Sequence, residues 1–202
     1  MIKISKSNLE IEKVYLIKKT PDLTNVECVH DERYYLYNKD GIELRFQKRN
    51  NAFELQRLEI VSKLSRSRKE MKISEVEFNK LKKNAVGPML RDGYYLSQDP
   101  QVVVRIYHGK YEGLKRVEVE FKSEKQAQKY ELPNWFGKEI SGTALARDGE
   151  LISLSQKEFK KLFGKWIILY QEWDKLDWLS FRTTIIISPM RFSTPRTANQ
   201  PL

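Results

Sequence analysis

Two stretches decide the fold: KRVEVEF at residues 115–121 and LEIEKVYLI at residues 9–17. In each of them glutamates alternate with apolar residues, which is the period of two that a β-strand with two unlike faces shows. The two glutamates of each stretch therefore share one face of a strand, and the apolar residues pack on the other. The four glutamates are Glu10, Glu12, Glu118 and Glu120.

Four carboxylates on the wet faces of two strands predict a cation between them. If the strands face each other, the carboxylates repel unless a positive ion lies among them. Oxygen ligands suit hard cations, so we expect Mg²⁺ or Mn²⁺. The chain has one cysteine, Cys28, and two histidines, His30 and His108. We therefore expect neither a Cys-based nor a His-rich metal site, and interpret Cys28 and His30 as ordinary surface or partly buried residues.

The same alternation places cations on the intervening strands, on faces that they share with further polar residues. Guanidinium groups match phosphate oxygens, and a metal bridges such oxygens, so this pattern predicts a site for a polyphosphate with a bound metal. The basic candidates are Arg45, Arg68, Lys72, Arg91 and Arg105, with Glu70 between two of them as a further acid.

Short alternating runs separated by turns fill the first three quarters of the chain and favour an α+β fold. We expect about eight strands in a largely antiparallel sheet or β-barrel with flanking helices. Helices are predicted after Ser74, ending at Gly87, and after Ser155, because each serine is followed three residues later by a glutamate in a capping-box pattern. The expected strands are 9–17, 34–37, 42–48, 53–60, 68–73, 94–96, 102–107 and 115–121, and a polar helix is expected at 123–129.

The 202 residues predict one main domain with an appendage. We expect a main domain at 1–154, an extension at 155–187 that packs on it, with a β-prone run at 183–187, and a flexible tail at 188–202. Since no apolar run approaches 18 residues and the N-terminus lacks an apolar signal segment, we expect no membrane span and a cytoplasmic protein.

Four segments resemble, in order, the motifs of the CYTH family, the triphosphate tunnel metalloenzymes. LEIEKVYLI resembles the family's E-x-E-x-K strand, ELRF its R-x-R strand, and SRKEMKIS its R-x-E-x-E strand. GLKRVEVEFKSEKQAQKYELPNWFGKEISG resembles the later block of a Glu-x-Glu strand, a polar helix and an L-P-x-W-x-G loop. The resemblance implies an eight-stranded antiparallel tunnel and the use of Mg²⁺ or Mn²⁺. It also implies hydrolysis of inorganic triphosphate, thiamine triphosphate or RNA 5′-triphosphates, or cyclisation of ATP to cAMP.

The chain departs from the family pattern at several basic positions. Val14, Gln47, Gln56 and Gly93 stand where the family usually has a cation, and Lys72 replaces an acidic residue. Three functions stay open on this basis: a triphosphatase, an adenylate cyclase of the same fold, and a nucleotide- or polyphosphate-binding module with weakened catalysis.

The resemblance, taken together with the alternation of charged residues along the strands, gives the following candidates. The catalytic and metal-binding candidates are Glu10, Glu12, Glu118 and Glu120, with Glu70 as a further metal ligand, and the phosphate-binding candidates are Arg45, Arg68, Lys72, Arg91 and Arg105. The expected partner is a small molecule that carries a triphosphate; a homodimer is plausible and nucleic acid is not favoured.

The net charge of +10 comes from 37 Lys and Arg against 27 Asp and Glu. If side chains alternate between the two faces of each strand, the tunnel lining would hold about as many carboxylates as cations. Most of the excess positive charge would then lie on the outer surface, where it would attract an anionic ligand.

Overall fold

The computed structural model describes residues 8–62 and 65–166. The strands and the helices α1 to α3 lie in a first compact unit, Met1–Phe163. The second unit, Gly164–Leu202, is described only over 164–166. The expected strand at 183–187 and the tail at 188–202 lie outside the described residues, and the domain limits at 154 and 187 stay predictions.

Nine strands form one antiparallel sheet in the order β5-β4-β3-β2-β6-β7-β8-β1-β9. The strands are β1 (Asn8–Ile17), β2 (Cys28–Lys39), β3 (Ile42–Arg49), β4 (Ala52–Ile60), β5 (Ser65–Lys72), β6 (Val86–Gln98), β7 (Gln101–Tyr107), β8 (Lys115–Phe121) and β9 (Phe136–Glu139). The helices are α1 (Glu75–Lys82), α2 (Glu124–Lys129) and α3 (Asp148–Ser153), with the 3-10 turn η1 (Gly109–Tyr111), and residues 156–166 are also helical. These elements confirm the α+β class.

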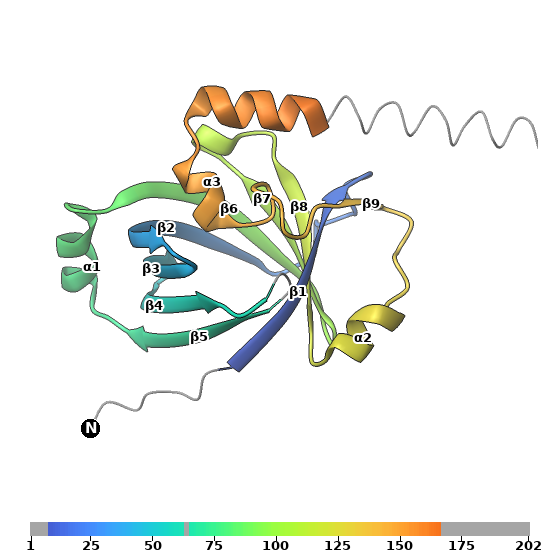
Figure 1. Cartoon of the computed structure of the whole chain (residues 1–202), viewed down its shortest axis with the longest axis horizontal. Coiled ribbons are helices and arrows are strands. Elements are labelled where there is room, and N and C mark those ends of the chain that lie inside the picture. Colours follow the sequence, from blue (N-terminus) through green and yellow to red (C-terminus); the bar gives the residue numbers. More distant parts are fainter. Residues whose placement is uncertain (1–7, 63–64, 167–202) are drawn as a thin grey trace, which may run out of the picture. The chain divides into compact units, whose positions relative to one another are not determined.

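The sheet curls so that β1 lies against β5 as well as against β8 (Figure 1). The pairing of β1 with β5 is short and runs from Asn8 opposite Arg68 to Ile11 opposite Ser65. The structure therefore differs from the expected regular eight-stranded barrel. It is one sheet of nine strands, in which the additional strand β9 pairs with the end of β1.

Capping boxes begin two of the helices as the sequence predicts. Ser74 accepts a hydrogen bond from the backbone N–H of Glu77, whose side chain accepts one from the N–H of Ser74. Ser155 and Glu158 make the same reciprocal pair. Helix α1, however, ends at Lys82 rather than at Gly87, because Gly87 already belongs to β6.

The apolar faces of the strands pack beneath the helices. One cluster joins Ile11, Val117 and Val119 to Ala127 of α2, and a second joins Phe46 to Phe78 of α1. Phe46 and Phe78 meet edge to face, with ring centroids 5.3 Å apart. The expected assignment of apolar residues to the outward face is confirmed, which leaves the opposite face of the sheet to polar side chains. Among the described residues, no helix is long and apolar enough to cross a membrane.

Candidate active site

Strands β1 to β8 and the start of α3 together line one cavity of about 200 Å³. Eight arginines and four carboxylates face it. The expectation of balanced charge is therefore wrong for this cavity, whose lining accounts for four of the ten net positive charges. The arginines are Arg33, Arg45, Arg49, Arg66, Arg68, Arg91, Arg105 and Arg116, and the acids are Glu12, Glu118, Glu120 and Asp148. A concave site with such an excess of guanidinium groups attracts a polyanion.

Glu12 and Glu120 are direct partners across β1 and β8. Like charges at opposed positions of an antiparallel pair repel. Burial, together with the charges of Glu118 and Glu120, raises the pKa of Glu12 to about 7. Arg66 acts against this rise, since its Nη2 lies 2.5 Å from Oε2 of Glu12. The two facing glutamates form the acidic side of the cavity.

Glu118 lies two residues before Glu120 and is held by arginines. Nε of Arg105 and Nη2 of Arg116 donate to its carboxylate at 2.8 Å each, and Nη1 of Arg91 lies 3.5 Å away. Burial alone would raise the pKa of Glu118, but these three guanidinium groups hold it well below its usual range. Glu118 is therefore ionised and fixes the direction of the arginines around it.

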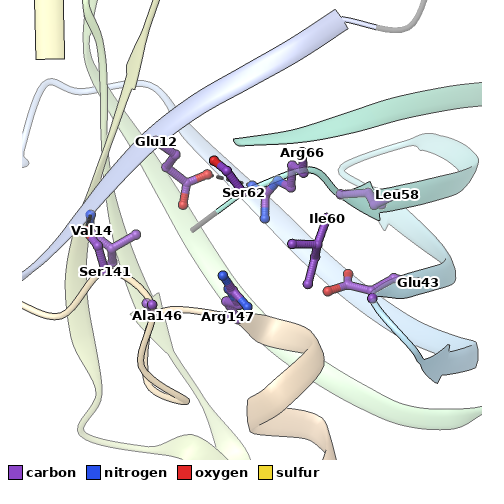
Figure 2. A pocket seen from close by; sticks show the side chains of 12 residues that line it. Glu12, Val14, Glu43, Leu58, Ile60, Ser62, Arg66, Ser141, Ala146 and Arg147 are labelled. Atoms are coloured by element: carbon purple, nitrogen blue, oxygen red, sulfur yellow. Dashed lines mark hydrogen bonds and ion pairs between the residues drawn. The ribbon is translucent and has the colours of Figure 1, made fainter. Parts of the chain in front are cut away.

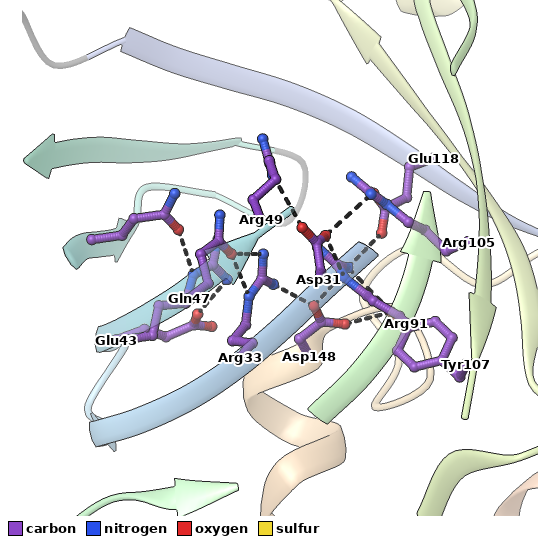
Figure 3. Close-up of polar contacts among 12 residues, drawn as sticks. Asp31, Arg33, Glu43, Gln47, Arg49, Arg91, Arg105, Tyr107, Glu118 and Asp148 are labelled. Atoms are coloured by element: carbon purple, nitrogen blue, oxygen red, sulfur yellow. Dashed lines mark hydrogen bonds and ion pairs between the residues drawn. The ribbon is translucent and has the colours of Figure 1, made fainter. Parts of the chain in front are cut away.

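Asp148, the first residue of α3, is a second buried acid among arginines (Figure 3). Its carboxylate accepts from Nη1 of Arg91 and Nη2 of Arg116 at 2.7 Å each. Arg33 donates to it as well, and the hydroxyl of Tyr107 does so at 2.6 Å. Despite burial, these partners hold the pKa of Asp148 well below its usual range. Asp148 thus ties α3 to strands β2, β6, β7 and β8.

Asp31 on β2 is a third buried acid that holds arginines in place. Its carboxylate accepts from Nε of Arg91 at 3.2 Å, Nη1 of Arg105 at 3.4 Å and Nε of Arg49 at 3.1 Å. The side chain of Asp31 is completely buried. Buried charges persist only when they are paired and hydrogen-bonded, so Asp31 and its arginines form a rigid, preorganised array.

Gly93 makes room for one of these arginines. Gly93 and Arg105 are partners across β6 and β7, and a Cβ on Gly93 would overlap Nη1 of Arg105. The sequence suggests a missing cation at Gly93. In the structure, Arg105 on the neighbouring strand β7 places its guanidinium group in the space that a side chain at position 93 would occupy.

The two glutamines at usually basic positions orient arginines. Oε1 of Gln56 accepts from Nε of Arg45 at 2.9 Å, and Oε1 of Gln47 accepts from Nε of Arg33 at 2.9 Å. Both amide groups donate to Oε2 of Glu54, at 3.0 and 3.1 Å. Gln47 and Gln56 are fully buried, which fixes the guanidinium planes next to them.

Val14 confirms the alternation predicted for β1. Val14 and Glu12 line a neighbouring cavity of about 40 Å³ (Figure 2), whereas Nζ of Lys13 donates to the carbonyl of Ala127 on the other side of the strand, at 3.0 Å. Glu12 and Arg66 line both cavities, so their ion pair lies between the smaller cavity and the main one.

Three of the predicted site residues are not among the side chains that line the main cavity. Glu70 and Lys72 on β5 are exposed, and Oε2 of Glu70 lies 3.4 Å from Nε of Arg68. The backbone of Glu10 lies opposite Arg66 where β1 pairs with β5, and its side chain is not among those that the structure describes. Their roles stay predictions, as do those of the seven candidates that face the cavity: Glu12, Arg45, Arg68, Arg91, Arg105, Glu118 and Glu120.

Sequence reasoning missed several residues of the site. Arg116 could have been found, because it shares the parity of Glu118 and Glu120 on one strand. Arg33 lies in the early part of β2, which the sequence did not predict as strand. Asp148 follows a loop, where no periodicity shows which way a side chain points.

The acidic side of the cavity fits a hard divalent cation in its chemistry. Glu12 and Glu120 offer carboxylate oxygens from adjacent strands, and burial together with the charges of Glu118 and Glu120 disfavours the ionised form of Glu12. A divalent cation bound there would favour the ionised form of Glu12. Glu118 is a weaker candidate ligand, since three arginines already hold it.

Comparisons with known proteins find similarity to an inorganic triphosphatase in both sequence and structure. The chain is 29% identical over 135 residues, 65% of its length and 89% of the relative, to an inorganic triphosphatase of Nitrosomonas europaea. The two proteins are homologous. The crystal structure of the inorganic triphosphatase NE1496 matches with a TM-score of 0.55 at 27% identity, over 72% of this chain and 95% of that one. A structure of the hypothetical protein NE1496 matches with the same TM-score at 26% identity, over 72% and 99%. No protein-family model matches the chain.

Proposed function

We propose that this protein hydrolyses a triphosphate, with inorganic triphosphate as its substrate, in the arginine-lined cavity. The observation that carries the proposal is the placement of eight arginines around one acidic side formed by Glu12 and Glu120. The homology to an inorganic triphosphatase supports the same reaction.

The shape of the cavity favours a compact substrate. Its volume of about 200 Å³ is below the roughly 300–1,000 Å³ typical of pockets for drug-sized ligands. Tyr95 is the one aromatic residue in the described lining, and the guanidinium of Arg105 lies 5.8 Å from its ring centroid. A nucleoside base would find little apolar surface to stack on. The lining therefore suits a chain of phosphates better than a nucleotide.

The arginines would bind and orient the phosphates. Arg91 and Arg105 are held by Asp31 and Glu118, and Arg45 is held by Gln56, so little reorganisation is needed when a polyanion enters. In the reaction the oxygen of a water bonds to the terminal phosphorus while the anhydride bond to the leaving diphosphate breaks, and the proton of the water is released to the phosphate products. Charge spreads over the phosphoryl oxygens in the transition state, where fixed guanidinium groups stabilise it most.

Glu12 and Glu120, with Glu10 as a further candidate, would hold a divalent cation, Mg²⁺ or Mn²⁺. Bound there, the ion would polarise the phosphoryl group and orient the attacking water. Glu118 would act mainly by positioning Arg105 and Arg116, because it already pairs with both.

A second candidate function is triphosphate binding without turnover. It is favoured by the apolar Val14, which faces the smaller cavity beside Glu12 at a position where the family usually has a lysine. In this case the cavity would hold the polyanion but would lack one group that aids the reaction.

Phosphate release separates these functions. Inorganic triphosphate, thiamine triphosphate and ATP would each be incubated with the protein and Mg²⁺ or Mn²⁺, and ATP samples would be assayed for cAMP as well. The proposal predicts fastest release from inorganic triphosphate. Formation of cAMP from ATP would refute the proposal in favour of an adenylate cyclase. Tight binding of triphosphate without phosphate release would refute it in favour of a binding module.

A further inference from the structure

Cys28, His30 and His108, all the cysteine and histidine of the chain, gather around one aspartate, Asp92. Nδ1 of His30 lies 2.6 Å from Oδ1 of Asp92, and Nε2 of His108 lies 2.9 Å from Oδ2 of the same carboxylate. The Cys28 sulfur and one donor atom each of His30 and Asp92 all lie within 4.8 Å of one another. Among the described residues, this is the group of cysteine, histidine and acidic side chains whose three possible metal-ligand atoms lie within that distance of one another.

The backbone holds these residues in place. His30 and Asp92 are direct partners across β2 and β6, and Cys28 is two residues before His30 on the same strand. The N–H of His30 donates to Oδ1 of Asn50 at 2.9 Å, and the N–H of His108 donates to the carbonyl of Leu90 at 3.0 Å. Ligands on paired strands keep their spacing better than ligands on loops.

The group lies on the opposite side of the strands from the arginines. Along β2, Cys28 and His30 alternate with Val29 and Asp31, which are buried, whereas the side chain of His30 is 73% exposed. Asp92 likewise follows Arg91, which faces the cavity. An open hollow of about 510 Å³, lined by His30, Asp92 and His108 among others but not by Cys28, gives access from solvent to the two histidines and the aspartate.

We propose that Cys28, His30 and Asp92 form a site for a transition-metal ion of the Zn²⁺ type, separate from the triphosphate cavity. Thiolate, imidazole and carboxylate together are the donor set that Zn²⁺ takes, whereas Mg²⁺ takes oxygen ligands. With bonds of about 2.0–2.3 Å, tetrahedral ligands lie roughly 3.3–3.8 Å apart. Nδ1 of His30 and Oδ1 of Asp92, now 2.6 Å apart, would separate on metal binding, and donor atoms as far as 4.8 Å apart would move closer.

His108 acts on this site through Asp92. A carboxylate that binds a metal is commonly fixed by a hydrogen bond to its other oxygen, and Nε2 of His108 is placed at that oxygen. His108 is therefore a positioning residue. Three protein ligands leave a fourth position for water or for a small ligand, as in zinc sites that remain open.

The composition of the chain makes the site easy to test. Since Cys28 is its single cysteine, any thiolate-to-cobalt charge-transfer absorption must come from this residue. The full-length protein would be titrated with Co²⁺ in excess Mg²⁺, and Zn²⁺ would then be added to displace the cobalt. We expect one equivalent of Co²⁺ to produce the absorption and Zn²⁺ to abolish it.

The variants should follow the assigned roles. Cys28→Ser should remove the absorption, and His30→Asn and Asp92→Asn should each weaken Co²⁺ binding by more than His108→Gln, for which we expect a loss of about 10–100-fold. Glu12→Gln, in the separate cavity, should leave the titration unchanged. Absence of the absorption, or an absorption that survives His30→Asn and Asp92→Asn unchanged, would overturn the proposal. So would a doubling of the molecular mass on cobalt binding, because the thiolate would then bridge two chains.

Discussion

The guanidinium group of Arg105 on β7 occupies the space that a side chain on Gly93 of β6 would fill. From there Arg105 donates to Glu118 at 2.8 Å and to Asp31 at 3.4 Å. Strand β7 thus supplies a positive charge at a place where β6 has only a glycine. The position that Arg105 takes beside Glu118 and Asp31 requires that residue 93 carry no side chain.

Gly93→Ala should displace Arg105 and strain the array. Overpacking of this kind lowers the free energy of unfolding by about 1–3 kcal/mol, which urea denaturation would measure. Because the overlap needs both partners, the losses from Gly93→Ala and Arg105→Ala should not add in the double variant. Gly164→Ala, in the helix of residues 156–166, is the control: a Cβ there meets nothing within 4 Å and alanine favours the helix, so this change should not lower the free energy of unfolding. Additive losses at 93 and 105 would contradict the assigned contact.

Arg68→Gln should weaken the binding of triphosphate without much loss of stability. Its side chain lines the cavity but is 32% exposed, and its partner Glu70 is 42% exposed, so we expect removal of its charge to have a small effect on stability. Loss of one charge-assisted contact is worth about 1.5–3 kcal/mol, or roughly 10–100-fold in affinity. Calorimetry would measure the dissociation constant. Arg57→Gln on the same sheet, paired with Glu59 at 2.8 Å and exposed, should change it little.

Asp148→Asn should destabilise the fold strongly. It removes the negative charge from three buried arginines, and breaking a buried ion pair from one side costs about 3–5 kcal/mol. Since the folded pKa of Asp148 is lowered, its contribution is present above the unfolded pKa of about 3.9 and is lost as pH falls through the folded value. Urea denaturation at several pH values would show this. Asp99→Asn, at an exposed pair with Lys122, should change the free energy of unfolding little.

The binding of a divalent cation should release protons near neutral pH. The pKa of Glu12 is raised to about 7 mainly by burial, with Glu118 and Glu120 adding to the effect. At pH 7 about half of the Glu12 carboxyls carry a proton, which a bound cation would expel, roughly half a proton per ion. Calorimetry of Mg²⁺ binding in buffers of different ionisation enthalpy would measure this number. Glu12→Gln should abolish the release; a value near zero in the unchanged protein would show that Glu12 does not meet the ion.

The raised pKa of Glu12 also sets the direction of a stability change. Because the folded value lies above the unfolded value of 4.5, the burial of the charged form destabilises the protein fully above pH 7. That penalty is relieved as pH falls from about 7 toward 4.5. Over this range, Mg²⁺ should therefore stabilise the protein more at the higher pH.

The alternating sequence predicted the inward faces of β1 and β8 because a strand has a fixed period of two. Glu12 and Val14 lie on one side and Lys13 on the other, as expected. The capping boxes at Ser74 and Ser155 are equally local signals, and both were predicted correctly.

Contacts between distant segments could not be predicted in this way. Asp148 meets Arg33 over a separation of 115 residues, and no local pattern couples them. The same holds for His30 and Asp92, which are 62 residues apart and meet only because β2 pairs with β6. Strand pairing, rather than residue type, made an aspartate the common partner of two isolated histidines.

The most direct test of the central claim is phosphate release from inorganic triphosphate by the unchanged protein, Glu12→Gln and Glu120→Gln, each with Mg²⁺, with Mn²⁺ and with a chelator. We expect release by the unchanged protein that stops when the chelator is added, and a loss of at least about 100-fold in kcat/KM, or about 2.7 kcal/mol, in either variant. Thermal unfolding would confirm that the variants are folded. Release that is equally fast with the chelator present, or unchanged in both variants, would contradict the claim.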